Sequence, residues 1–283
     1  MARILNRRKF IGTTSFTAAG VMMGSSFAAG CSPDVHRAVE PYDIMADVMK
    51  YRKIDAHCHP EDDLAKQIET ADRLGIEWLQ ISQPVTNFSG TEPEGPDVVR
   101  QHNDEVYKAM KAYPGRFVGF FTLNPIYRKE SLEEIKRCVD LGMSGYKGYI
   151  QVKVNDPLYY PIIEKLIDLK MVVFMHTFCQ MGMGGYRMKY DTGRFPGTTL
   201  PEDMVEAAKR YPEAMFHFAH IGGGGDWEYE CKMLKQCPNI FVDTGGSNNE
   251  EHMIDFAIEQ LGEDRIFFGT DNCYHHGIGK ILA

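Results

Sequence analysis

The chain has 283 residues, with 31 basic and 39 acidic side chains and a formal net charge of −8 at neutral pH. A net acidic chain without clusters of lysine and arginine argues against nucleic acid as a partner. The length fits one large domain or a single barrel. The seven cysteines form no C-x-x-C pair and show no spacing typical of a disulfide framework.

The first thirty residues have the composition of an export signal. They contain four basic residues and no acidic one, include the twin arginine Arg7–Arg8, and end in small residues before Cys31. This order is typical of a signal peptide. The paired arginines resemble a Tat signal, and FAAGC resembles a lipoprotein box in which Cys31 is lipidated. A transmembrane anchor is the alternative, which the Gly, Ser and Thr content disfavours.

We therefore expect residues 1–31 to be a Tat lipoprotein signal and residues 32–51 a polar linker to a domain over 52–283. The protein would be periplasmic or on the cell surface, and it would contact the membrane only through the lipid anchor at Cys31.

From residue 52 onward, apolar runs typical of buried strands alternate with segments of helical periodicity. The expected strands are 52–57, 78–84, 117–125, 143–150, 171–178, 214–223, 239–247 and 265–272. The expected helices are 63–75, 96–113, 131–142, 159–170, 201–211, 226–237 and 250–262. Gly75, Gly142 and Gly262 are expected to end helices, and Ser131 to begin one.

This alternation indicates a parallel sheet. Eight strands in about 220 residues favour a (β/α)₈ TIM barrel over the alternative, a doubly wound α/β sheet. After the eighth strand only HHGIGKILA is left. Either the last helix is minimal or the sequence is cut off at its C-terminus, and of the two we favour truncation of the barrel before its last helix.

Residues that can bind metal ions end four of the expected strands. They are His57 and His59 on the first, His176 on the fifth, His220 on the sixth and Asp271 on the eighth. In a strand, alternate residues point to one face, which places His57 and His59 together. The C-terminal strand ends of such a barrel carry its chemistry. Imidazoles and a carboxylate at these ends predict a site for a divalent ion.

The segments IDAHCHP, FMHTF, FAHIGG and FFGTDN, in this order, resemble the amidohydrolase superfamily. The closest group is the amidohydrolase-2 branch, which includes aminocarboxymuconate-semialdehyde decarboxylase-like enzymes, and the resemblance covers essentially residues 52–276. It implies one divalent metal ion, usually Zn²⁺, held by His57, His59, His176 and Asp271. It also implies that His220 is catalytic and orients the metal-bound water or polarises the substrate. Asp271 could accept the proton of that water.

Structural roles stay open for single members of this set. Asp271 could cap a helix, and His220 could be a hydrogen-bonded core histidine. His217 has the opposite phase to His220 and is expected to point outward, toward the helices. Lys147 lies where binuclear superfamily members carry a carboxylated lysine. Because Lys147 falls in the middle of its run, we favour a substrate-facing or buried structural lysine over one that bridges a second metal ion.

A segment longer than an ordinary strand-to-helix connection, residues 179–200, follows the fifth expected strand and is typical of a lid or specificity loop. Its Tyr186, Arg187, Tyr190 and Arg194 could bind an anionic substrate, with an ordinary solvated loop as the alternative. Tyr149 and Trp227 are further candidates for substrate binding, and packing roles fit them equally well. The run 222–225 is expected to be a turn rather than a phosphate site.

Together these features predict an exported metal-dependent hydrolase that uses a metal-activated water on a small organic substrate, which could bear a carboxylate. A metal-dependent decarboxylase of the same family is the alternative. A non-catalytic, surface-anchored binding protein is a second alternative. The predicted partner is a small molecule, and a homodimer stays open.

Overall fold

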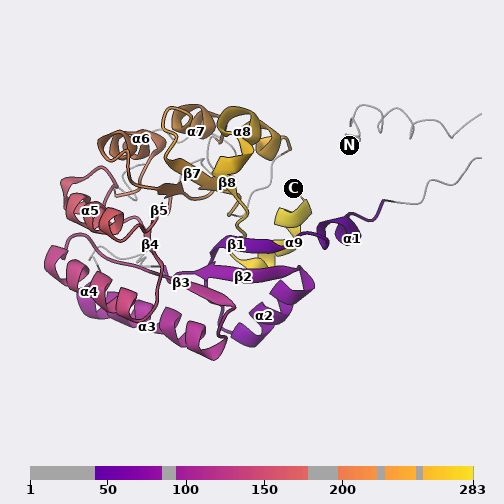
Figure 1. Ribbon diagram of the computed structural model, residues 1–283, viewed down its shortest axis with the longest axis horizontal. Coiled ribbons are helices and arrows are strands. Elements are labelled where there is room, and N and C mark those ends of the chain that lie inside the picture. Colours follow the sequence, from indigo (N-terminus) through magenta and orange to yellow (C-terminus); the bar gives the residue numbers. More distant parts are fainter. Residues whose placement is uncertain (1–41, 85–93, 178–196, 222–226, 247–250, 283) are drawn as a thin grey trace, which may run out of the picture. The chain divides into compact units, whose positions relative to one another are not determined.

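The computed structural model describes residues 42–84, 94–177, 197–221, 227–246 and 251–282. The chain divides into two units, Met1–Tyr42 and Asp43–Ala283, and the second holds the described helices and strands. Its eight strands are parallel and follow one another round a sheet in the order of the sequence (Figure 1). They are β1 (Lys53–Cys58), β2 (Ile76–Ile81), β3 (Phe117–Phe121), β4 (Gly145–Gly148), β5 (Val173–Met175), β6 (Phe216–Phe218), β7 (Ile240–Asp243) and β8 (Ile266–Phe267).

Backbone hydrogen bonds join the segment after β8 to β1. The N–H of Ala56 donates to the carbonyl of Phe268 at 2.8 Å, and the carbonyl of His57 accepts from the N–H of Asp271 at 2.7 Å. The eight strands therefore form a nearly closed barrel. The predicted (β/α)₈ TIM barrel is confirmed. Its closure brings His57 and Asp271 side by side, although they lie near opposite ends of the domain's sequence.

The helices surround the strands (Figure 1). They are α1 (Ile44–Val48), α2 (Leu64–Arg73), α3 (Pro96–Ala112), α4 (Arg128–Asp140), α5 (Tyr160–Asp168), α6 (Pro201–Arg210), α7 (Trp227–Leu234), α8 (Met253–Leu261) and α9 (Cys273–Leu282), with short 3₁₀ turns at Pro157–Tyr159 and Glu263–Arg265. Each of the seven helices expected from the sequence is present. A further helix, α1, lies within the segment expected to be a linker.

Residues Cys273–Leu282 after β8 form the short helix α9, which packs against α2, and the expected truncation stays a prediction. The close approach of the two helices depends on Gly277. A Cβ atom at this position would lie 2.4 Å from Cδ1 of Leu74. Glycine at this position therefore lets α9 lie close to the end of α2.

The ends of the helices follow simple backbone chemistry. Gly75, Gly142 and Gly262 have φ angles of +68°, +89° and +89°, and they follow the last turns of α2, α4 and α8 as expected. Ser131 does not begin a helix, because α4 already starts at Arg128. Its hydroxyl instead donates to the carbonyl of Asn124 at 2.8 Å and ties the helix to the turn after β3.

The interior of the barrel holds aromatic and polar side chains from neighbouring strands and from strands that are not neighbours. The ring of Phe174 on β5 stacks on His217 of β6 with 3.7 Å between ring centroids, and its edge meets His57 of β1 at 4.7 Å. The prediction that His217 points outward is therefore wrong. The phase was counted back from His220, but β6 ends at Phe218 and His220 has a left-handed φ of +67°, so alternation does not carry over between the two residues.

Candidate metal centre

Three side chains bring ligand atoms together at the C-terminal end of the barrel. Oδ1 of Asp271 lies 3.2 Å from Nε2 of His57 and 3.2 Å from Nε2 of His59. All three ligand atoms lie within 4.8 Å of one another. Bonds of 2.0–2.2 Å to one ion in tetrahedral geometry would separate neighbouring ligand atoms by about 3.3 Å. His57, His59 and Asp271 thus have the spacing of residues that share a metal ion.

Hydrogen bonds on the far side of each ring fix where the imidazole protons lie. Nδ1 of His59 lies 2.6 Å from the carbonyl oxygen of Ser82, which can only accept, so this nitrogen carries the proton. Nδ1 of His57 lies 3.0 Å from a carboxylate oxygen of Asp243 and donates in the same way. Each Nε2 atom therefore carries a lone pair and no proton. Both atoms face Oδ1 of Asp271, which also lacks a proton. Such a convergence of acceptors fits a cation between them.

The electrostatic environment favours the protonation states that bind metal. Burial lowers the pKa of His57 to about 4 and that of His220 to about 3, so both imidazoles are neutral at pH 7. Burial alone would raise the pKa of the Asp271 carboxyl, but the adjacent side chains of His59, His220 and His57 hold it below its usual range. Neutral imidazoles and an ionised carboxylate are the forms that bind a divalent ion.

Asp243, at the end of β7, organises this region, and sequence reasoning missed it. Its buried carboxylate accepts from Nδ1 of His57 and from the backbone N–H groups of Gly245 at 2.7 Å and His220 at 3.3 Å, and its Oδ2 lies 2.7 Å from Nε2 of His217. A carboxylate behind a metal-binding histidine sets the ring's tautomer and orientation. The signal was present in NIFVDTGGS, where an acid ends an apolar run as Asp271 does in RIFFGTDN.

Gly245 makes room for the pair formed by His57 and Asp243. A Cβ at this position would lie 2.6 Å from Oδ1 of Asp243 and 2.7 Å from Nδ1 of His57. Both atoms are held by hydrogen bonds and cannot move aside cheaply. A side chain there would therefore disturb the hydrogen bond that orients His57.

His220 and His176 form a second pair beside the three ligands. Nε2 of His220 lies 3.0 Å from Nδ1 of His176, and Nδ1 of His220 lies 3.9 Å from Oδ2 of Asp271. Nδ1 of His220 has no hydrogen-bond partner among the described residues. Within the same residues, His176 does not belong to the three-residue group that shares one set of close ligand atoms. Its role as a fourth ligand stays a prediction, and so does the catalytic role of His220.

Lys147 lies inside the site rather than at its rim. The side chain is fully buried, and Nζ lies 2.9 Å from Nε2 of His57 and 3.3 Å from the centre of the Phe174 ring. Burial lowers the pKa of this lysine to about 7. The structure thus places Lys147 against the metal-binding nitrogen of a candidate ligand.

The candidates for substrate binding fall in different places. Tyr149 is buried in the site, where its ring stacks on His176 with centroids 5.6 Å apart and its hydroxyl lies 3.3 Å from that of Ser82. Trp227, the first residue of α7, packs its ring edge to face with Phe256 of α8 at 5.4 Å. The other candidates lie outside the described residues, and so do the expected turn and the lipidation site: Tyr186, Arg187, Tyr190, Arg194, the run 222–225 and Cys31.

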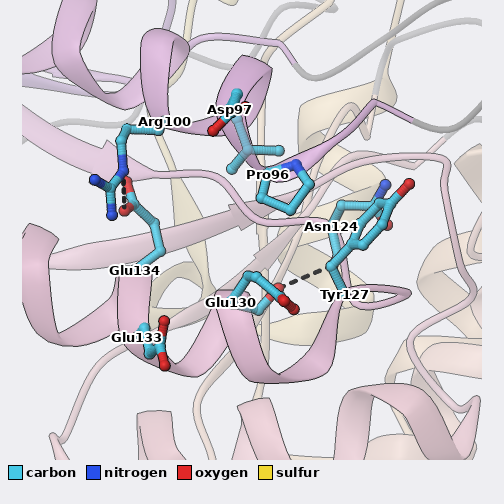
Figure 2. A pocket seen from close by; sticks show the side chains of 10 residues that line it. Pro96, Asp97, Arg100, Asn124, Tyr127, Glu130, Glu133 and Glu134 are labelled. Atoms are coloured by element: carbon cyan, nitrogen blue, oxygen red, sulfur yellow. Dashed lines mark hydrogen bonds and ion pairs between the residues drawn. The ribbon is translucent and has the colours of Figure 1, made fainter.

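A hollow of about 230 Å³ lies apart from the histidines, between the start of α3 and the start of α4 (Figure 2). Its lining includes Asp97 and Arg100 from α3 and Glu130, Glu133 and Glu134 from α4. Glu134 pairs with Arg100 at 3.4 Å, and the described residues that line the hollow include no histidine. The charged side chains of the hollow are explained by this ion pair. The histidines, by contrast, bring ligand atoms together, so we place the functional site there.

Proteins of known identity resemble this chain along most of its length. A 2-amino-3-carboxymuconate-6-semialdehyde decarboxylase from Dictyostelium discoideum is 23% identical over 267 residues, which cover 84% of this chain and 73% of the relative. Two solved structures share the fold at 17% identity. One is a dihydroxybenzoic acid decarboxylase from Polaromonas with bound manganese and 2-nitroresorcinol (TM-score 0.63, covering 82% of this chain and 90% of that chain). The other is the 5-carboxyvanillate decarboxylase LigW from Sphingomonas paucimobilis (TM-score 0.61, 78% and 76%).

At this identity the solved structures establish the barrel fold alone. The family is established by a match along the sequence. The model of the amidohydrolase family Amidohydro_2 matches residues 33–275, which contain the three close ligands, both members of the second histidine pair, Asp243 and Lys147. This chain therefore belongs to the amidohydrolase family.

Proposed function

We propose that this protein is a metal-dependent decarboxylase of a small unsaturated or aromatic carboxylate. The observation that carries the proposal is the convergence of three unprotonated ligand atoms, from His57, His59 and Asp271, beside the buried His220. The names of the three relatives described above support the reaction, because each is a decarboxylase of a carboxyl group on an unsaturated framework. They favour this reading over the hydrolase that we expect first from the sequence.

The residues present fit a divalent ion. His57, His59 and Asp271 would hold it, with His176 proposed as the fourth ligand through Nε2, because its Nδ1 faces His220. Two or three imidazoles and one carboxylate suit both Zn²⁺, which the sequence resemblance implies, and Mn²⁺, which one similar structure contains. When bound, the ion would act as a Lewis acid that draws electron density from the substrate's oxygen atoms.

The chain's own residues would manage the proton. Decarboxylation breaks the bond between the carboxyl carbon and its neighbour, leaves the electron pair on that neighbour, and needs a proton there once CO₂ departs. If Nδ1–H of His176 donates to Nε2 of His220, the single proton of neutral His220 lies on Nδ1, 3.9 Å from Oδ2 of Asp271. We assign proton delivery to the Nδ1–H of His220, which would take a proton back from water once the products leave, while the ionised Asp271 supplies none. Burial of His220, which is 7% exposed, keeps bulk water away from the carbanion-like carbon.

The test uses protein loaded with Zn²⁺ or Mn²⁺ and a panel of ¹³C-carboxyl substrates: hydroxylated benzoates, a carboxyvanillate and an aminocarboxymuconate semialdehyde. We expect labelled CO₂ and bicarbonate from at least one of them, detected by NMR, and none from His57→Ala. Incorporation of ¹⁸O from water into a cleaved ester, lactone or amide without CO₂ release would show a hydrolase instead. Tight binding of a panel member without turnover would favour the non-catalytic binding protein.

Location in the cell is a separate part of the proposal. We propose export by the Tat route and a lipid anchor at Cys31, which the twin arginine and the FAAGC segment support. Within the described part of the chain, no helix has the length and hydropathy needed to cross a membrane. Labelling of cells with a fatty-acid analogue, compared with a Cys31→Ala variant, tests the anchor directly.

A further inference from the structure

The amine of Lys147 and a metal ion would both bind the same atom, Nε2 of His57. Lys147 comes from β4, is fully buried, and places Nζ 2.9 Å from Nε2 of His57. Nδ1 of His57 already carries the ring's proton, because it donates to Asp243. Nε2 therefore has one lone pair, in the plane of the ring, and Nζ–H of Lys147 donates to it.

We propose that Lys147 competes with the metal ion for His57, so that metal binding displaces the amine from Nε2. The inference rests on the metal site in the proposed function. A lone pair that accepts a hydrogen bond cannot also bind a cation, so the two contacts exclude each other. An ammonium group this near to a metal ion would also repel it strongly in a buried site. Lys147 thus sets the metal affinity of the centre.

The surroundings of Lys147 support this role over that of a bridging ligand. Among the described residues, Nε2 of His57 is the one hydrogen-bond acceptor that Nζ reaches. The other close neighbour is the face of the Phe174 ring, whose centre lies 3.3 Å away and which favours a cation. After displacement, Nζ can stay over this ring without leaving the buried site. A lysine that bridges two ions as a carboxylated group would be an anion, which the face of an aromatic ring disfavours.

The experiment compares Zn²⁺ affinity in three proteins after removal of metal with a chelator: the wild type, Lys147→Met, and Lys136→Met. Methionine has a similar length but cannot donate a hydrogen bond. Lys136 is exposed on α4 and pairs with Asp140, so its variant controls for the loss of one positive charge. By competition with a chromophoric chelator, we expect Lys147→Met to bind Zn²⁺ about 10- to 100-fold more tightly, as for the loss of one charge-assisted hydrogen bond. We expect Lys136→Met to match the wild type.

Equal or weaker Zn²⁺ binding by folded Lys147→Met would overturn the inference while leaving the metal site intact. Loss of Zn²⁺ from this variant, together with the mass of one added CO₂ on the wild type, would show a bridging carboxylated lysine instead. If none of the three proteins binds Zn²⁺, the proposed metal site fails and the inference fails with it.

Should Lys147→Met not fold, the wild type alone still tests the inference. In metal-stripped protein labelled with ¹⁵N-histidine, we expect His57 to carry its proton on Nδ1 and to show an Nε2 that accepts a hydrogen bond. Zn²⁺ should then shift the ¹³Cε signal of Lys147. A proton on Nε2 of His57, or a Lys147 signal that Zn²⁺ leaves unchanged, would refute the competition.

Discussion

Replacing Asp243 with asparagine should weaken metal binding without removing any ligand. The two backbone N–H groups of Gly245 and His220 face Oδ1 of Asp243, so they would retain the amide oxygen of asparagine at this position. The amide NH₂ would then take the place of Oδ2, which lies 3.0 Å from Nδ1 of His57 and 2.7 Å from Nε2 of His217. The Nδ1–H of His57 now shares both carboxylate oxygens, since Oδ1 lies 3.1 Å away. In the variant this N–H would keep only the uncharged amide oxygen and would have a donor beside it, so the proton and the ring would be held less firmly for metal binding through Nε2.

The size of the effect follows from the role of such carboxylates. Loss of a hydrogen-bonded partner behind a metal-binding histidine typically costs 10- to 100-fold in affinity, which corresponds to about 1.4–2.7 kcal/mol of binding free energy. We expect this loss for Asp243→Asn in chelator competition with Zn²⁺, and no change for Asp140→Asn, whose carboxylate is exposed on α4. Unchanged affinity in Asp243→Asn, with His57 still protonated on Nδ1 by ¹⁵N NMR, would refute the reasoning.

Four further predictions concern other parts of the chain. His220→Ala should keep the metal and lose turnover by roughly 10²–10⁴-fold, whereas His57→Ala should lose both; metal content measured beside kcat distinguishes them. Gly245→Ala should weaken metal binding, because its Cβ would press on the His57 ring, and should cost about 1–3 kcal/mol in urea unfolding. Protonation of His57 should lower the free energy of unfolding of metal-stripped protein by about 1.6 kcal/mol between pH 6.5 and pH 5, since the unfolded histidine takes up a proton below 6.5 and the folded one only near pH 4. Urea unfolding at both pH values checks this. Replacing Arg7 and Arg8 with lysine should retain the precursor in the cytoplasm, as cell fractionation would show.

The sequence was sufficient for the barrel because the two kinds of element differ in their patterns. Strands of a parallel barrel are buried on both faces and appear as continuous apolar runs, such as MVVFM in β5, while the helices show one apolar stripe. His57, His59 and Asp271 were predictable for a related reason. Each is a polar residue at the end of an apolar run, which is where the chemistry of this fold lies.

The missed contacts depend on which strands face each other across the barrel. Asp243 meets His57 over a separation of 186 residues, and Lys147 meets the same ring over 90. Contacts between residues so far apart in the sequence leave no local pattern in it, because they form only once the sheet has closed. Local geometry caused the error at His217. The left-handed residue His220 breaks the alternation by which its orientation was inferred.

The tautomer of His220 links the structure to the choice between hydrolysis and decarboxylation. Hydrolysis needs a base beside the metal to take a proton from water, whereas decarboxylation needs an acid that protonates carbon. If His176 binds metal through Nε2, its Nδ1–H donates to Nε2 of His220, and neutral His220 then offers only an N–H at Nδ1. It can give a proton but has no free lone pair with which to take one. In the reverse hydrogen bond, Nε2–H of His220 would donate to Nδ1 of His176. Nδ1 of His220 would then have a free lone pair and could act as a base, while His176 would carry its proton on Nε2 and could not bind metal through that atom. The direction of this 3.0 Å hydrogen bond, which ¹⁵N-histidine NMR of the Zn²⁺-loaded protein can read, therefore shows whether His220 can act as the acid of a decarboxylase or as the base of a hydrolase before any substrate is known.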